Sequence, residues 1–92
     1  MRPCKRRRIL NRFSHNYFKP KGIPMNCLRE TILFEEEIEA LRLKNIKKFS
    51  QIECAKEMDI SQSTFQRILS SAYNKVSDAI VNGKAIRIVN RF

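Results

Sequence analysis

The sequence predicts a mainly α, three-helix domain with an extended basic N-terminal arm and a short C-terminal strand. Three observations support this prediction. Apolar residues recur at three- and four-residue spacing between residues 35 and 82, which is typical of amphipathic helices. Ser50 and Ser61 stand where serine caps a helix start. All three prolines precede residue 25, so the helices are expected after that point.

Residues 1–33 are predicted to form the basic arm. The 92-residue chain has 19 Lys and Arg and 9 Asp and Glu, a net charge of +10. Nine of the basic residues and only one of the acids lie in residues 1–33. A small domain this basic usually binds a polyanion. The aromatic stretch 16–20 favours extended backbone, and we expect the N-terminal and C-terminal extended pieces to pair beside the helices.

The first helix is expected over residues 35–46. Glu35, Glu36 and Glu37 stand in its first turn, where the helix dipole favours negative charge. For these three and Glu39 we expect dipole and solubility roles, although an acidic metal-binding patch is the alternative. The residues expected on its apolar face are Ile38, Leu41 and Asn45, with Ala40 and Leu43 beside them.

Two further helices are expected over residues 50–58 and 61–82. Ser50 and Glu53 form a capping box at the start of the first of these, and Gly83 can adopt the left-handed cap that ends the second. The short helix should bury Ile52, Ala55 and Met58. The apolar face of the long helix comprises Phe65, Ile68, Leu69, Ala72, Val76, Ala79 and Ile80. Helices therefore fill a domain over residues 34–83, and residues 84–92 form a strand-like tail that packs on it.

The spacing from residue 51 to residue 69 is typical of a helix-turn-helix motif. Ala55 is the small residue that lets two helices cross closely. Met58 and Ile60 flank the turn, and Phe65 and Ile68 face back toward the first helix. Cys54 fills another small inward position. The turn itself has Asp59 where glycine is usual, and aspartate tolerates left-handed backbone better than most residues. A plain three-helix bundle is the alternative.

This motif places a polar set on the outward face of the long helix. Side chains at that position reach base edges in the major groove of DNA. The expected base-reading residues are Gln62, Ser63, Gln66 and Arg67. The expected phosphate-binding residues are Arg6, Arg7, Arg8, Lys47, Lys48, Ser61 and Thr64. For the three arginines of the arm, a solvated charge run is the alternative.

Four stretches of the chain together resemble a known family. They cover residues 17–24, 39–43, 61–69 and 81–88. In this order they resemble UPF0251, also called DUF134, a family of small prokaryotic proteins regarded as DNA-binding. The central part is similar to the helix-turn-helix of sigma-factor region 4. The resemblance implies duplex DNA as the partner and a function in transcription regulation, without naming a target.

Other classes of function fit the sequence less well. Cys4, Cys27 and Cys54 are far apart, and His15 has no partner in a recognisable spacing, so we expect no metal, no cofactor and no enzymatic activity. No membrane span or signal peptide is apparent, which predicts a cytoplasmic protein. An RNA-binding or ribosome-associated protein and an adaptor of the transcription machinery are the alternatives. A homodimer on DNA is expected, because the tail offers a strand edge either to its own arm or to a second chain.

Overall fold

The computed structural model describes residues 17–90, and its elements follow the predicted order. Three helices dominate: α1 (Glu35–Leu41), α2 (Gln51–Met58) and α3 (Gln62–Asn82). Within residues 17–90 the strands are β1 (Tyr17–Phe18), β2 (Glu30–Phe34) and β3 (Ala85–Val89). The mainly α fold class and the C-terminal strand are therefore confirmed. A short 3-10 helix, η1 (Met25–Cys27), lies between β1 and β2.

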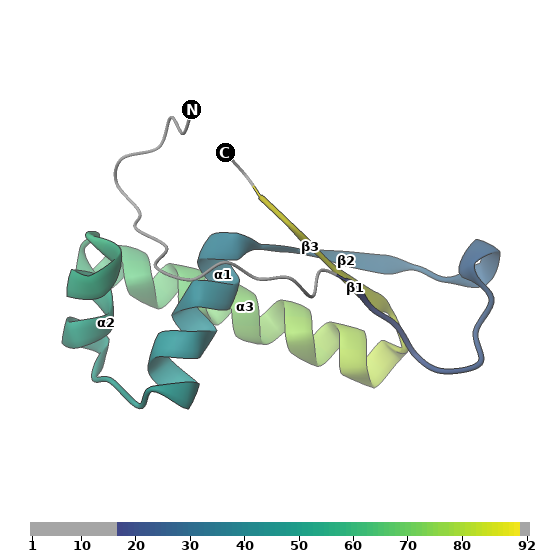
Figure 1. Ribbon diagram of the computed structural model, residues 1–92, viewed down its shortest axis with the longest axis horizontal. Helices are drawn as coiled ribbons and strands as arrows, with labels where there is room; N and C mark the ends of the chain where they lie inside the picture. The colour runs from purple at the N-terminus through teal and green to yellow at the C-terminus, as the bar shows by residue number, and fades with distance from the viewer. Residues whose placement is uncertain (1–16, 91–92) are drawn as a thin grey trace.

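The long helix α3 runs along the molecule and is flanked by different partners at its two ends. In Figure 1, α1 and α2 lie against its first half, and the three strands lie over its second half. The molecule measures 41 × 29 × 19 Å. One end therefore holds the two-helix unit α2–α3, while the other holds the sheet and the loop around η1.

The sheet has the order β1-β3-β2, which places the C-terminal strand in the middle. Tyr17 pairs with Arg87 in the antiparallel β1–β3 ladder. Leu33 pairs with Ile88 in the parallel β2–β3 ladder. The predicted pairing of N-terminal and C-terminal extended pieces is thus confirmed. The tail strand β3 is paired on both sides with strands of its own chain. Its edges in this register are therefore not available to a second copy.

Strand β2 was not predicted. The sequence prediction assigned residues up to 33 to an extended arm, yet Glu30–Phe34 forms a five-residue strand that leads directly into α1. Its partner, β3, begins 55 residues after the start of β2, because α1, α2 and α3 all lie between the two parallel strands. Pairing over that separation leaves little local trace in the sequence.

The predicted first helix is confirmed as a continuous helical segment, although its interior differs from the prediction. After α1, residues Arg42–Ile46 form a π-helical turn, η2. Ala40 and Leu43 are fully buried, whereas Asn45, which was expected on the apolar face, is exposed. The expectation for the acidic residues was also wrong in part. Glu36, Glu37 and Glu39 are buried, so solubility is not their role.

The core lies where α1, η2, α2 and α3 meet. Its residues are Ala40, Leu43, Cys54, Ala55, Met58, Phe65, Ile68 and Leu69. Two predicted core residues were wrong, because Ile52 is 61% exposed and Ile80 is 73% exposed. Ile52 lies about 110° around α2 from its buried face, given the ~100° turn per helical residue. Ile80 lies in the last turns of α3, where only the Ala79 side is buried.

Candidate nucleic-acid interface

The turn between α2 and α3 has the geometry that the sequence predicts. Asp59 ends α2 in left-handed backbone, with φ 59° and ψ 47°. The Ile60 amide donates to the Ala55 carbonyl at 3.0 Å, which closes the turn. Ser61 then caps α3, and its hydroxyl accepts a hydrogen bond from the Thr64 amide. Three residues therefore join the two helices, and their own backbone and side-chain bonds fix the joint.

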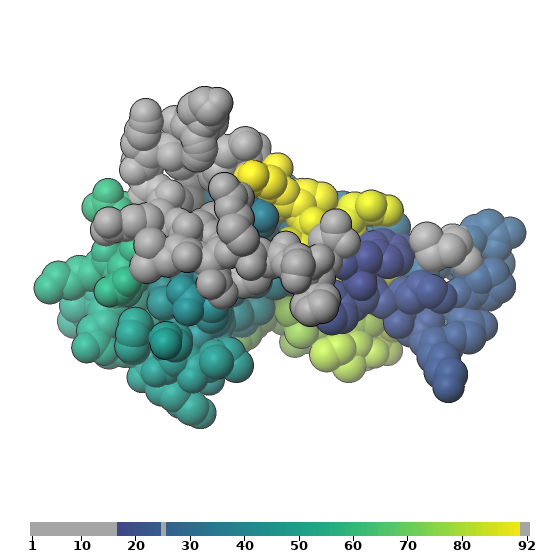
Figure 2. Space-filling model, viewed as in Figure 1, coloured from purple at the N-terminus to yellow at the C-terminus, as the bar shows by residue number. Residues whose placement is uncertain are grey.

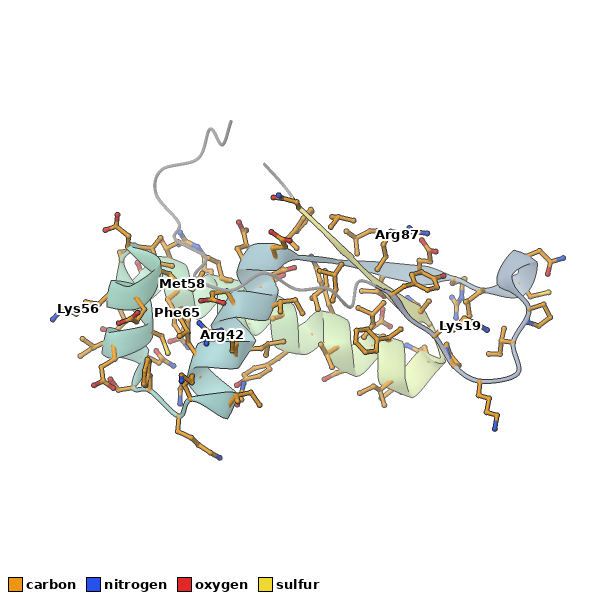
Figure 3. All side chains as sticks on the ribbon, viewed as in Figure 1. Lys19, Arg42, Lys56, Met58, Phe65 and Arg87 are labelled. Carbon is orange, nitrogen blue, oxygen red and sulfur yellow. The ribbon has the colours of Figure 1, made fainter. Side chains whose placement is uncertain are left out.

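Buried side chains hold the two helices together behind this turn. Ala55 is 4% exposed, so the backbones approach closely there, as expected. Met58 and Phe65 are fully buried, and Figure 3 shows both within the space between the helices. Cys54 is also buried, and desolvation raises the pKa of its thiol. The thiol therefore stays protonated and serves as a packing group rather than a nucleophile.

The four residues expected to read bases lie together on the outward side of α3. Gln62, Ser63, Gln66 and Arg67 are exposed and line one open hollow of about 490 Å³. Within residues 17–90, neither glutamine nor Arg67 makes a side-chain hydrogen bond or ion pair. Ser63 is within 3.3 Å of the Ser61 hydroxyl. Three of the four side chains are thus available to a ligand.

The residues expected to bind phosphate are divided among three places. Lys47 and Lys48 are exposed in the segment between η2 and α2, and Lys48 has left-handed backbone with φ 64°. The Ser61 hydroxyl donates to the Thr64 hydroxyl at 2.9 Å at the start of α3. Arg6, Arg7 and Arg8 lie outside the described residues, as does His15.

A second hollow, of about 710 Å³, lies at the joint of α2 and α3, and it brings in a residue that the sequence reasoning missed. Its lining comprises Ala55, Lys56, Asp59, Ile60, Ser61, Thr64 and Arg67. Lys56 is exposed and points outward from α2 in Figure 3. Lys56 directly follows Ala55, the residue at the helix crossing, and this position places it on the outward side of α2. That placement is the signal that could have identified Lys56 from the sequence. Asp59 is the acid of this lining.

The ion pairs of the described chain are unevenly distributed between the end that holds α2 and the rest of the molecule. Four ion pairs occur in the described chain, and their cations are Arg42, Lys75, Lys84 and Arg87. Among the described residues, no ion pair involves the cations between residues 44 and 67, the stretch that leads into α2, forms it and includes the first turns of α3. These cations are Lys44, Lys47, Lys48, Lys56 and Arg67. The positive charge around the helix pair is therefore free to meet an external anion.

Residues 17–90 lack two other kinds of feature. No group of three or more His, Cys, Asp or Glu side chains there has an arrangement that could hold a metal ion. None of the described helices is long and apolar enough to span a membrane.

Comparison with known proteins identifies the family. The family described as "Protein of unknown function DUF134" matches residues 1–90. The chain belongs to the DUF134 family. A UPF0251 protein of Caldanaerobacter subterraneus subsp. tengcongensis is 51% identical to this DUF134 chain over 87 residues, which cover 95% of this chain and 74% of the relative. A UPF0251 protein of Dehalococcoides mccartyi strain 195 is 52% identical, with the same coverage. No solved structure matches this DUF134 chain. The resemblance to UPF0251, or DUF134, that was noted from the sequence is thereby confirmed.

Proposed function

We propose that this protein is a sequence-selective duplex-DNA-binding protein and a transcriptional regulator, with α3 as its recognition helix. The observation that supports this most directly is the outward face of α3. Gln62, Gln66 and Arg67 are exposed there without partners in the described chain, close to cations that form no ion pairs. Ordering long side chains of this kind costs conformational entropy, and contacts with a bound ligand can offset that cost.

The chemistry of this face suits base edges. An arginine can donate two hydrogen bonds to O6 and N7 of guanine, and a glutamine can pair with N6 and N7 of adenine. A helix fits the major groove, and residues near the start of a recognition helix contact the bases. Met58 and Phe65, both fully buried, hold α2 and α3 rigidly behind the face. Rigid placement favours selective binding because less conformational entropy is lost.

The cations near the helix pair suit the DNA backbone. Lys47 and Lys48 precede α2, and Lys56 projects from α2 beside the hollow at the joint. Phosphate contacts position a protein on DNA and supply affinity for any sequence, whereas base contacts supply selectivity. This difference makes the two groups of residues experimentally separable.

The experiment starts from duplexes selected by the protein from a random pool. Binding of the best site and of a random duplex is then measured by fluorescence anisotropy at two salt concentrations. Arg67→Ala should weaken the best site selectively, by about 1–3 kcal/mol, because it removes a two-hydrogen-bond contact to one base. Lys47→Ala removes the same charge at an exposed position nearby and is the matched control. It should weaken both duplexes equally and reduce the salt slope by about one.

Three outcomes would contradict the proposal. An unchanged ratio of specific to random affinity in Arg67→Ala would mean that α3 does not read bases. Equal or tighter binding of a single-stranded or duplex RNA of the same sequence would favour the RNA-binding alternative, since base readout by a helix requires the wide major groove of DNA. Absence of nucleic-acid binding altogether would favour the adaptor alternative.

A further inference from the structure

The opposite end of α3 has an apolar surface that the described chain leaves uncovered. Ile80 and Val81 are 73% and 78% exposed, and Phe18 of β1 is 53% exposed. In Figure 2 the end of α3, in yellow-green, lies directly beside the purple segment around β1, away from the teal of α2. Exposed apolar residues scattered singly are ordinary, but a contiguous group beside a recess indicates an interaction site.

A groove of about 290 Å³ separates the end of α3 from β1. Its apolar lining is provided by Phe18, Pro20, Ala79, Ile80 and Ile86. Because Ile86 belongs to the central strand and Ala79 is only 3% exposed, the floor of the groove is rigid. A pre-formed apolar recess can accept side chains of a ligand without prior rearrangement.

Positive charge surrounds this groove. Lys19 and Lys84 line it, and Arg29 and Lys21 are exposed in the loop that connects β1 with β2. Two acids at this end are already paired with cations: the Asp78 carboxylate lies 2.7 Å from Lys84, and the Glu30 carboxylate lies 2.8 Å from Arg87. Figure 3 shows Lys19 at the end of the molecule farthest from Lys56. The surface therefore combines an apolar floor with a cationic rim.

We infer that this distal surface, formed by Phe18, Lys19, Ile80, Val81, Lys84 and Ile86, binds an acidic amphipathic segment of a partner protein. Apolar side chains of the segment would fill the groove, and its carboxylates would face the rim. Complementary charge of this kind steers association and selects among partners. The inference does not depend on DNA binding by α3.

Other occupants match the surface less well. A second copy of the chain would bring the same cations against each other, which costs energy at a symmetric contact. DNA would pair with the cations but would leave Ile80 and Val81 in water. The distal surface also lies away from the reading face, which is the outward face of α3 with Gln62, Gln66 and Arg67. The 14 residues from Arg67 to Val81 span about 21 Å of helix. A partner bound at the distal surface would leave the reading face open.

The test uses a synthetic helical peptide with leucine at three- and four-residue spacing and glutamate on the opposite face, titrated into the full ¹⁵N-labelled chain. Its twin carries lysine in place of glutamate. Amide shifts are expected at the end of α3 and around β1, with no change at Gln62 to Arg67. The lysine twin should bind at least about tenfold more weakly because its charge repels the rim.

Matched variants of the protein test which side chains contribute to peptide binding. Ile80→Ser and Lys19→Glu should each weaken the glutamate peptide by about tenfold, the first through lost apolar burial and the second through reversed charge. Ile52→Ser is the control, because Ile52 is similarly exposed but lies on α2. DNA binding should be unchanged in Ile80→Ser, so failure of this inference is separable from failure of the proposed function.

Three results would overturn the inference. Peptide-induced shifts confined to Gln62 to Arg67 would mean that the peptide only mimics DNA. Self-association in sedimentation experiments that Ile80→Ser abolishes would assign the surface to a second copy. Binding to phosphatidylglycerol vesicles that requires Ile80, without peptide binding, would assign it to an anionic membrane.

Discussion

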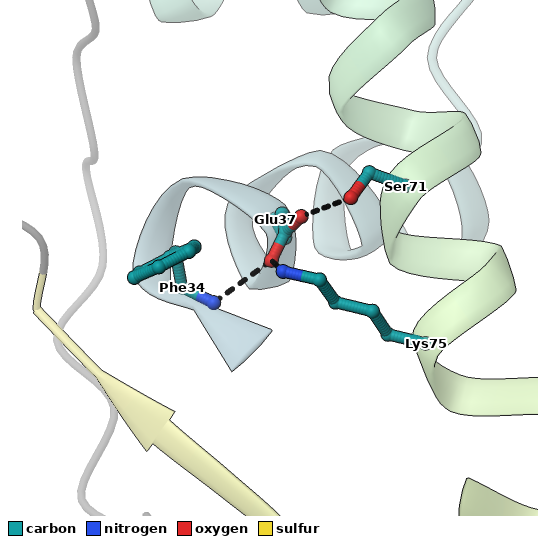
Figure 4. A network of polar contacts seen from close by, with 4 residues as sticks. All are labelled: Phe34, Glu37, Ser71 and Lys75. Carbon is teal, nitrogen blue, oxygen red and sulfur yellow. Dashed lines mark hydrogen bonds and ion pairs between the residues drawn. The ribbon is translucent and has the colours of Figure 1, made fainter. Parts of the chain in front are cut away.

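Lys75 Nζ lies 2.9 Å from Glu37 Oε1, and this ion pair joins the first turn of α1 to the middle of α3. The same carboxylate accepts hydrogen bonds from the Ser71 hydroxyl at 2.6 Å and from the Phe34 amide at 2.9 Å (Figure 4). Lys75 also lies 4.6 Å from the centre of the Phe34 ring. Glu37 is only 3% exposed, so its charge is compensated almost entirely by these partners. This cluster holds α3 against α1 and β2.

Replacement of Glu37 by glutamine should destabilise the fold by about 2–4 kcal/mol. The change removes the charge and leaves Lys75, whose side chain is 28% exposed, with an incompletely compensated ammonium group. Urea unfolding measures the free energy directly. Glu35→Gln, in the same turn of α1 but half-buried rather than buried, is the control and should change stability by no more than about 0.5 kcal/mol. Equal stability of the two variants would show that the cluster contributes little.

The glutamates at the start of α1 show which features of the fold could be predicted from the sequence and which could not. Three glutamates at a helix start predicted the helix boundary correctly, because the dipole argument is local. The burial of Glu37 depends on its contacts with Ser71 and Lys75, which lie 34 and 38 residues further along the chain. Contacts across such separations follow from how the helices pack, and no spacing within residues 35–39 indicates them.

Replacement of Ala55 by leucine should destabilise the protein by about 1–3 kcal/mol. Ala55 is 4% exposed at the contact of α2 with α3, and a larger side chain would force the helices apart. Thermal unfolding should show a lower midpoint. Ile52→Ala on the same helix serves as control, because Ile52 is 61% exposed and its truncation should change little. A loss of stability in Ile52→Ala as large as that in Ala55→Leu would contradict the assignment of the buried face.

The helix pair and the pairing of β1 with β3 were largely predictable from the sequence, whereas strand β2 was not. Ser50, Ser61, Asp59 and Gly83 define helix ends through bonds and backbone angles within a few residues. The outward face of α3 then follows from helical periodicity once Phe65 is placed inward. Strand β2 and the groove beside Phe18 depend on pairing with β3, which is formed at the other end of the chain. The sequence alone therefore indicated the candidate DNA-binding surface but not the distal surface.

Acid should weaken the sheet through Glu30. Arg87 donates two hydrogen bonds to its carboxylate, at 3.0 and 2.8 Å, and Tyr17 donates a third. These bonds, with those from Arg87 foremost, lower the pKa of Glu30 from its ordinary value of 4.5. A lowered folded-state pKa means that the stabilisation is present above pH 4.5 and is lost as the pH falls through the folded-state pKa.

The comparison of wild type with Glu30→Gln isolates this effect from that of other carboxylates. At neutral pH the variant should melt at a lower temperature, because the amide lacks the charge that Arg87 contacts. The difference should narrow as the pH falls below 4.5, since the wild-type carboxylate becomes protonated there. A difference in melting temperature that stays constant from pH 7 to about pH 3 would show that the charge of Glu30 is not the cause.

Two copies of the protein are expected on a palindromic site. One chain presents a single copy of α3, the proposed recognition helix, and helix-turn-helix proteins commonly bind two half-sites about 34 Å apart, one on each copy. Because β3 already pairs with β1 and β2, this arrangement does not depend on strand pairing through the tail. Light scattering of the purified complex should give two protomers on the full palindrome and one on an isolated half-site. Insertion of about half a helical turn between the half-sites rotates them to opposite faces of the duplex and should abolish any cooperativity. A single protomer on the full palindrome would instead mean that one α3 and the cations around it recognise the whole site.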